Sequence, residues 1–153
     1  MKTVIQRVLG ANISINNAEP IEIGEGLVCL FGVCVDDDIS DADKLARKIV
    51  NLRIFNDSEG KKNISAAERG LDVLAAPNFT LYADTKKGLR PSFDKAAKHE
   101  LAKPAFEFFL KKLRAYATGK VVCGEFGAHM KINIVNDGPV TIIMDTKDWK
   151  RRK

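Results

Sequence analysis

Asn78-Phe79-Thr80 is one of two short segments whose backbone groups could do chemistry. It follows Pro77 at the end of a run of strand-forming residues. Proline has no N–H and restricts the residue before it, so we expect the strand to break there and leave the following amides free. Amides that point into a cavity can stabilise the negative charge that develops on a carbonyl oxygen during acyl transfer. This segment is therefore a candidate oxyanion site.

The second segment is Asn136-Asp137-Gly138-Pro139, which separates two strand-like stretches. By themselves these residues favour an ordinary hairpin turn. A Gly-Pro pair can also hold two carbonyl groups in an unusual direction, and this interpretation depends on the rest of the chain. Since only roughly 5–6% of X-Pro bonds in folded proteins are cis, these four residues alone do not predict a cis bond.

The usual motifs of side-chain catalysis are missing. The sequence has no Gly-x-Ser-x-Gly elbow, no His-Glu-x-x-His motif and no Gly-x-x-x-x-Gly-Lys phosphate loop. Cys29 and Cys34 lack metal-ligand spacing, and His99 and His129 form no recognisable constellation with a cysteine or carboxylate. We predict buried, reduced thiols, no metal and no cofactor. A triad whose members are distant in sequence stays an alternative.

Basic residues are concentrated in two places. The net charge is +5, and residues 147–153 hold five basic residues and one acidic residue, so this C-terminal tail carries most of the excess. Such a tail is usually solvated, but it can also contact phosphate. The second cluster is Lys86-Lys87-Gly88-Leu89-Arg90, and we expect Lys86 and Lys87 to contact an anionic substrate.

Length and composition predict one soluble domain. A chain of 153 residues can bury a core without disulfides or metals. Its longest apolar run, residues 27–35, is too short to cross a membrane, and its N-terminal residues do not have a secretory pattern. We predict a domain over residues 1–146, a basic tail over residues 147–153, a cytoplasmic location and no membrane contact.

Hydrophobic patterning predicts several strands, and the stretch at residues 27–35 should be central because it is apolar on both faces. The other predicted strands are residues 2–9 and 11–16 with a bend at Gly10, 21–23, 53–55, 71–76, 121–123, 130–135 and 140–144.

Two main helical regions are expected between these strands. Ser40 and Asp43 resemble a capping box before the first, and the second begins near Phe93, with Pro104 in the first turn of a new helix. The order of elements predicts an α/β (α+β) fold, a single compact domain with a strongly curved, barrel-like sheet.

Six stretches, in order along the chain, resemble the D-aminoacyl-tRNA deacylase family. They cover nearly everything except the basic tail: VIQRV (4–8), RIF (53–55), NFTLYADTKKG (78–88), RPSF (90–93), FGAHM (126–130) and NDGPVT (136–141). A single Gly-Pro pair would carry no information, but this ordered set is highly specific.

The resemblance implies a homodimer with the fold of that family and active sites at the subunit interface. It implies hydrolysis of the ester that joins a D-amino acid, or glycine, to the terminal adenosine of tRNA. Gly138-Pro139 would be cis and would enter the partner subunit's site, where its carbonyls would meet the substrate's α-amino group. An L-amino acid would be rejected because its side chain would clash with this backbone.

The resemblance also suggests roles for individual residues. The ribose hydroxyl beside the ester would help to activate water, while the amides of Phe79 and Thr80 would stabilise the oxyanion. The Thr80 hydroxyl is an alternative nucleophile, but a positioning or backbone role is favoured. Arg7 would brace Gly138-Pro139 or contact phosphate, and Met130 would line the adenosine pocket. The simpler alternatives are a surface arginine and a core methionine.

One departure from the family pattern concerns Pro77-Asn78, which replaces the usual Ser-Gln. Asn78 is one methylene shorter than glutamine, and we expect it to contact the adenosine or the ester. Proline at the first position also occurs in an animal sister group with relaxed chirality, but this chain keeps the usual Asn-Asp-Gly-Pro-Val-Thr at residues 136–141, which favours D-specific activity. Two other functions stay open: a relaxed deacylase that accepts some L-aminoacyl-tRNAs, and a non-catalytic dimer that binds nucleic acid.

Overall fold

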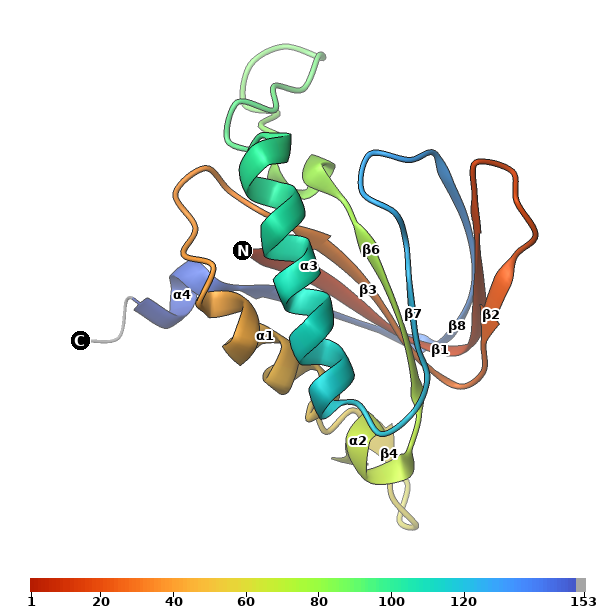
Figure 1. Ribbon diagram of the computed structural model, residues 1–153. Coiled ribbons are helices and arrows are strands. Elements are labelled where there is room, and N and C mark those ends of the chain that lie inside the picture. The colour runs from red at the N-terminus through yellow and green to blue at the C-terminus, as the bar shows by residue number, and fades with distance from the viewer. Residues whose placement is uncertain (151–153) are drawn as a thin grey trace.

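A strongly curved sheet is the framework of the computed structural model, which describes residues 1–150 (Figure 1). The long strand β1 pairs on one side with β2 and β3, and on the other side with β8 along almost its whole length. The sheet continues from β3 through β6 to β7 by parallel pairing. The strands are β1 (Lys2–Ile15), β2 (Ile21–Ile23), β3 (Gly26–Gly32), β6 (Asp72–Pro77), β7 (Val121–Cys123) and β8 (Met130–Asp145), with a separate pair β4 (Phe55–Asn56) and β5 (Lys62–Ile64).

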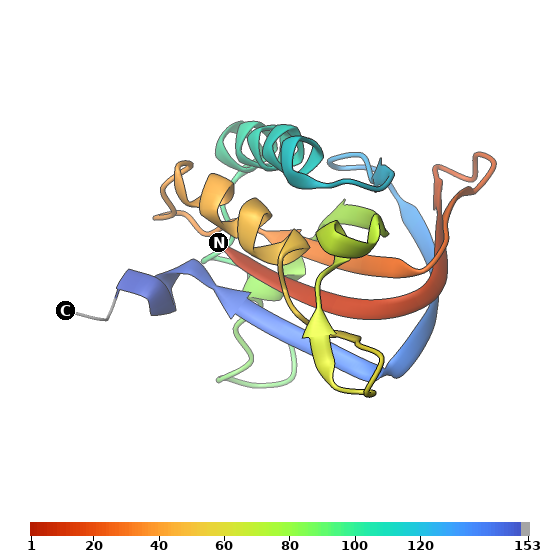
Figure 2. The same cartoon turned by 90° about the horizontal axis from the view of Figure 1, so that it is seen from below.

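Helices α1 (Asp41–Val50) and α3 (His99–Tyr116) cover one face of this sheet (Figure 2). The main core lies between them and the sheet, where Phe31 of β3 stacks on Phe109 of α3 with 4.4 Å between ring centroids. Three short elements complete the described chain: α2 (Ala66–Arg69), the 3-10 helix η1 (Phe79–Tyr82) and α4 (Thr146–Lys150). The α+β class, the curved sheet, the central strand and the two main helical regions are confirmed.

Asp72 stabilises the curvature by joining segments from both ends of the sheet. Its carboxylate accepts the amide of Gly24 at 3.1 Å, between β2 and β3, and the amide of Lys120 at 2.9 Å, just before β7. The Lys120 side chain also donates to the carbonyl of Glu22 in β2. These contacts bring β7 close to β2, so the sheet is nearly closed. A second apolar cluster, which includes Val8, Ile13, Val28, Leu74 and Val122, is shared by the strands.

The predicted hairpin turn at residues 136–139 is wrong. β8 continues from Met130 to Asp145 and remains antiparallel to β1 on both sides of this segment. The pairing shifts register between Gln6 and Val8 and again between Val8 and Gly10, so the irregularity is absorbed as a bulge within one ladder. The Gly138–Pro139 peptide bond is cis. Long-range pairing with β1 therefore outweighs the local preference of Asp-Gly-Pro for a turn.

Both predicted helix starts also need correction. Ser40 precedes α1 but makes no side-chain cap, and Asp43 instead accepts the Tyr116 hydroxyl at 2.8 Å, which joins α1 to α3 and lowers the pKa of that carboxyl. The capping box is at Ser65 and Glu68, before α2. The second helix begins at His99 rather than near Phe93, and Pro104 lies inside it, beyond the first turn.

The first residues of the predicted basic tail pack against the domain. Lys147 Nζ lies 2.7 Å from Asp36 Oδ1 and 3.3 Å from Cys34 Sγ, and hydrogen bonds from Cys34 and Lys147 lower the pKa of Asp36 to about 2. Trp149 packs against the main core. Residues 151–153 of the tail lie outside the described residues. Within residues 1–150, no helix is long and apolar enough to span a membrane.

Gly26 provides a test of the close contact between β3 and β6, because a Cβ there would lie 2.0 Å from the Asp72 carbonyl oxygen. We expect Gly26→Ala to force the two strands apart and to lower the free energy of unfolding by about 1–3 kcal/mol, the usual effect of overpacking. Thermal denaturation measures the change. Gly10→Ala is the control, since the nearest atom to its Cβ would be the Ile23 carbonyl oxygen, 3.4 Å away, and equal melting temperatures for the two variants would contradict the prediction.

Candidate active site

The Asn78 segment lies where β6 ends beside β3. The Asn78 amide donates to the Phe31 carbonyl at 2.7 Å, and η1 begins at the next residue. Gly32 allows this close approach, because a Cβ there would lie only 2.9 Å from the Asn78 carbonyl oxygen. At the other end of η1, burial raises the pKa of Tyr82 above its ordinary value, and its hydroxyl donates to Asp37 at 3.4 Å. The short helix is thus attached to the core at both ends.

We expect free amides at Asn78, Phe79 and Thr80, and within residues 1–150 this holds for the Phe79 amide only. Asn78 Oδ1 caps η1 by accepting the Thr80 amide at 3.2 Å and the Thr80 hydroxyl at 2.5 Å. A ligand would therefore have to replace Asn78 Oδ1 at the Thr80 amide. The Phe79 amide, at the first position of the helix, has no acceptor among residues 1–150. It is the better placed of the two donors.

A cavity of about 230 Å³ lies beside Phe79. Its wall is formed by the end of β6, the start of η1 and the segment between β7 and β8, with the residues Pro77, Asn78, Phe79, Phe126, Gly127, Ala128 and Met130. The structure thus brings together Asn78, Phe79 and Met130 from the predicted site. Phe126 and Ala128 were missed as site residues, although the stretch FGAHM that contains them was recognised.

Arg7 lies with the Gly138-Pro139 segment instead. Its side chain is buried, and it donates to the Ile54 carbonyl at 2.7 Å and to the Asp137 carbonyl at 3.3 Å. Its Nε is also 3.1 Å from Asp137 Oδ2. Arg7 is therefore not a surface arginine. The cavity beside Phe79 is not lined by Gly138 or Pro139, so a single subunit does not bring the two predicted parts of the site together.

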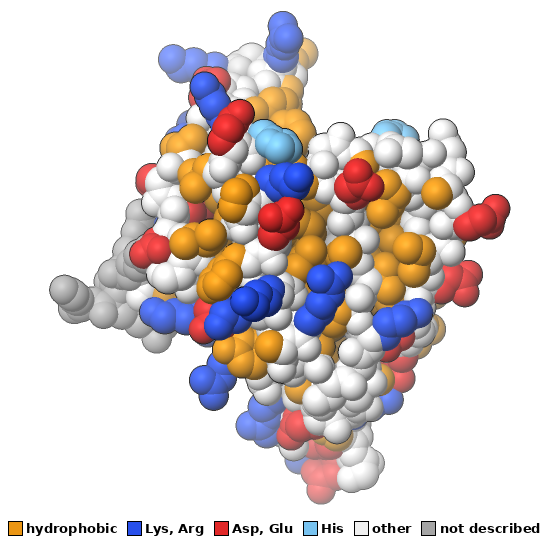
Figure 3. Space-filling view, in the orientation of Figure 1, with side chains coloured by type: hydrophobic (Ala, Val, Ile, Leu, Met, Phe, Trp, Pro, Cys, Tyr) orange, Lys and Arg blue, Asp and Glu red, His pale blue; other side chains and the backbone are white. Residues whose placement is uncertain are grey.

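Lys86 and Lys87 lie in the loop between η1 and α3, which emerges at the same end of the sheet as the segment between β7 and β8 (Figure 1). They line a different cavity, together with Lys95, which the sequence analysis missed. Phe93 lies in the chain between Ser92 and Asp94, which line this second cavity, and its ring meets that of Phe79 edge-on with 5.2 Å between centroids. On the face covered by the helices, basic and acidic side chains are interspersed, while basic side chains project at the loop end (Figure 3).

A family model described as D-Tyr-tRNA(Tyr) deacylase matches residues 4–145. A D-aminoacyl-tRNA deacylase of Thermosipho melanesiensis is 46% identical over 147 residues, which cover 96% of this chain and 98% of the relative. A D-aminoacyl-tRNA deacylase of Bacteroides thetaiotaomicron is 47% identical over 148 residues, which cover 97% of this chain and 99% of the relative.

Two solved structures have the same fold. A c-Myc DNA unwinding element binding protein superposes with a TM-score of 0.87 at 37% identity, covering 95% of this chain and 98% of that one. A probable eukaryotic D-amino acid tRNA deacylase superposes with a TM-score of 0.83, covering 94% and 97%, but at 15% identity it supports the fold alone.

The Asn78 cap can be tested without a substrate. Asn78→Ala removes the acceptor of the Thr80 amide, and loss of a cap typically costs about 1 kcal/mol, so we expect the Thr80 amide to exchange roughly fivefold faster. Asn78→Ser is the matched control, because a serine hydroxyl can also cap and should restore slow exchange. Equal exchange rates in wild type and Asn78→Ala, measured by NMR hydrogen exchange, would disprove the cap.

Proposed function

Because this chain belongs to the D-aminoacyl-tRNA deacylase family and is therefore a hydrolase of the D-aminoacyl-tRNA ester, we propose that the cavity beside Phe79 receives the acylated end of tRNA. The observation that supports this choice is that Phe79 lines the cavity and that its amide has no acceptor among residues 1–150. Met130 would contact the adenosine, and Asn78 would contact the adenosine or the ester.

Hydrolysis would need no covalent intermediate with the protein. Water would attack the carbonyl carbon of the ester, assisted by the free ribose hydroxyl beside it. The bond between this carbon and the esterified ribose oxygen would then break, and that oxygen would take up a proton. The Phe79 amide, and the Thr80 amide once released by Asn78, would stabilise the oxyanion. The Thr80 hydroxyl donates to Asn78 Oδ1, an arrangement that favours positioning over nucleophilic attack.

Gly138 and Pro139 would act as the chiral filter in the site of a second subunit. Their backbone would occupy the space that an L side chain needs, while glycine and D-amino acids would fit. Two observations support this role: the pair is absent from the cavity beside Phe79 in its own subunit, and Arg7 fixes the preceding residue Asp137.

The homodimer is supported by the exposed edge of the sheet. Within the described residues, β8 pairs with β1 on one side only, which leaves a sixteen-residue strand with an open edge. Long edges of this kind are usually covered or blunted. Apolar side chains are exposed nearby, with Leu9 at 58%, Val135 at 58% and Ile143 at 67%. A second copy of the chain would cover them. An enzyme that acts on tRNA is also expected in the cytoplasm.

A second candidate function is nucleic-acid binding without catalysis, favoured by the 37% identity to a protein whose name describes binding to a DNA unwinding element. Lys86 and Lys87, with the basic residues after Lys150, would supply the phosphate contacts. A chain that ends at Lys150 discriminates the two functions. A pure binder should lose much of its affinity and salt dependence, whereas a deacylase should keep its turnover.

We predict rapid hydrolysis of D-tyrosyl-tRNA and of glycine attached to a non-cognate tRNA, with L-tyrosyl-tRNA left intact. Release of the radiolabelled amino acid, compared with the uncatalysed rate for each ester, is the measurement. Cleavage of the L-ester at a comparable rate would point to a relaxed deacylase instead, and the absence of cleavage of any ester would favour the non-catalytic binder.

Arg7→Met should reduce the preference for the D-ester by about tenfold or more, since hydrogen bonds from a charged donor contribute about 1.5–3 kcal/mol and both Ile54 and Asp137 would lose theirs. Arg53→Met is the control, because Arg53 is an exposed arginine that contacts Asn63 in the β4–β5 region. The ratio of kcat/KM for D- and L-tyrosyl-tRNA reports the effect, and an unchanged ratio in Arg7→Met would rule out the bracing role.

A further inference from the structure

The loop between η1 and α3 is fixed at its base. Asp84 and Ser92 exchange two backbone hydrogen bonds, of 2.7 and 2.9 Å, which close the loop. The Val35 amide donates to the Lys95 carbonyl at 3.1 Å and the Ala97 amide to the Val33 carbonyl at 2.9 Å, which attach the end of the loop to the segment after β3. Side chains at the base of the loop are therefore held in a defined place.

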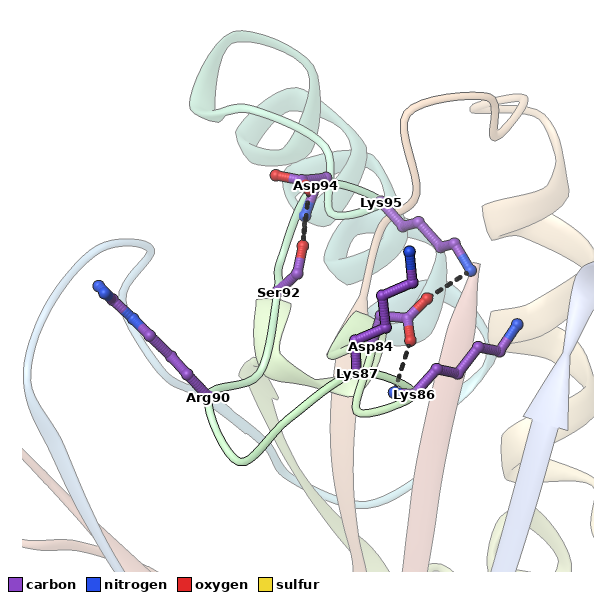
Figure 4. A pocket seen from close by; sticks show the side chains of 7 residues that line it. All are labelled: Asp84, Lys86, Lys87, Arg90, Ser92, Asp94 and Lys95. Atoms are coloured by element: carbon purple, nitrogen blue, oxygen red, sulfur yellow. Dashed lines mark hydrogen bonds and ion pairs between the residues drawn. The ribbon is translucent and has the colours of Figure 1, made fainter.

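Three lysines gather around one carboxylate at this base. Asp84 Oδ2 lies 3.1 Å from Lys95 Nζ, and Asp84 Oδ1 accepts the Lys86 amide at 3.0 Å. Figure 4 shows Lys86, Lys87 and Lys95 pointing to one side of the loop, whereas Arg90 points away. These residues line a cavity of about 260 Å³.

The charges at this place do not cancel. The Lys86 amide and Lys95 lower the pKa of Asp84, so this carboxyl is ionised at neutral pH and holds Lys95 in position. A second carboxylate in the lining, Asp94, accepts the Ser92 hydroxyl at 2.7 Å. The lining as a whole has four basic residues, Lys86, Lys87, Arg90 and Lys95, and two carboxylates, Asp84 and Asp94, so positive charge is in excess. Such an excess suits a compact anion with several oxygen acceptors, of which phosphate is the example that tRNA offers.

We propose that this cavity binds a backbone phosphate of the tRNA 3′-terminal strand, with Lys95 as a binding residue that no sequence motif marked and Asp84 as the residue that positions it. The inference rests on the proposed function, which places the terminal adenosine in the cavity beside Phe79. Phe93 directly follows Ser92 and contacts Phe79, so the two cavities lie on either side of this ring pair, and a strand that left the adenosine cavity on this side would reach the lysines.

The first test compares two substrates, D-tyrosyl-tRNA and the D-tyrosyl ester of adenosine, which has no phosphate. The variants are Lys95→Gln and the triple change of Lys86, Lys87 and Lys95 to Gln. We expect the triple variant to raise the KM of the tRNA about tenfold relative to that of the adenosine ester, with little change in kcat. Lys61→Gln is the control, because Lys61 is an exposed lysine paired with Glu59 in a separate turn. Equal effects on both substrates, or no difference from Lys61→Gln, would overturn the proposal.

The second test measures binding of uncharged tRNA at several salt concentrations and does not depend on hydrolysis. Each phosphate of a single strand that the protein neutralises contributes about 0.7 to the slope of log K against log salt, so loss of this one phosphate site should make the slope of the triple variant smaller by about 0.7. A wild-type slope in this variant would contradict the phosphate site. If the wild type hydrolyses neither ester but the triple variant still has the smaller salt slope, the proposed function fails and the phosphate site stands.

Discussion

The antiparallel ladder between β1 and β8 is the interaction on which the rest of the structure depends. It joins the first strand to the last over the full length of β1, and it continues through a register shift rather than ending at Gly138-Pro139. Because β1 pairs with the residues of β8 before and after Gly138-Pro139, the Asp137–Pro139 backbone has a defined position at the surface. Arg7 belongs to the same irregular part of β1 and contacts Asp137, so one ladder both carries the segment and supplies its support.

The candidate acyl site depends on the other side of β1, where β3 pairs with β6. This parallel pair ends at Pro77, and the chain turns at once into η1, where Asn78 caps the helix. The chemistry proposed there uses a backbone donor rather than a reactive side chain. The position of such a donor depends on the backbone that carries it. Here the buried strand β6, the close approach of Gly32 to Asn78 and the buried Tyr82 hold that backbone in place.

Much of the fold could be predicted from local patterns, because these patterns reflect burial. The residues from 27 to 35 are apolar on both faces and overlap the central strand β3, and the helix expected around Pro104 is α3, which buries Phe106, Phe109 and Leu113 in the core. The continuity of β8 could not be predicted in this way, since it is determined by a partner strand more than a hundred residues away in sequence. Asn78 was recognised as a site residue, but its hydrogen bond to the Thr80 amide depends on how the chain leaves β6. Lys95 lacked any sequence signal and joins the loop lysines only through Asp84.

In the proposed mechanism, the backbone amide of Phe79 binds the substrate carbonyl while the Gly138-Pro139 backbone of a partner subunit excludes L side chains. It can be tested most directly by NMR titration of the labelled protein with a non-hydrolysable, amide-linked D-tyrosyl-adenosine, with the L-tyrosyl compound in parallel. A large downfield shift of the Phe79 amide proton with the D compound, and none with the L compound, is predicted. A Phe79 amide that does not respond to the D compound, or that responds equally to both, would contradict this explanation of the site.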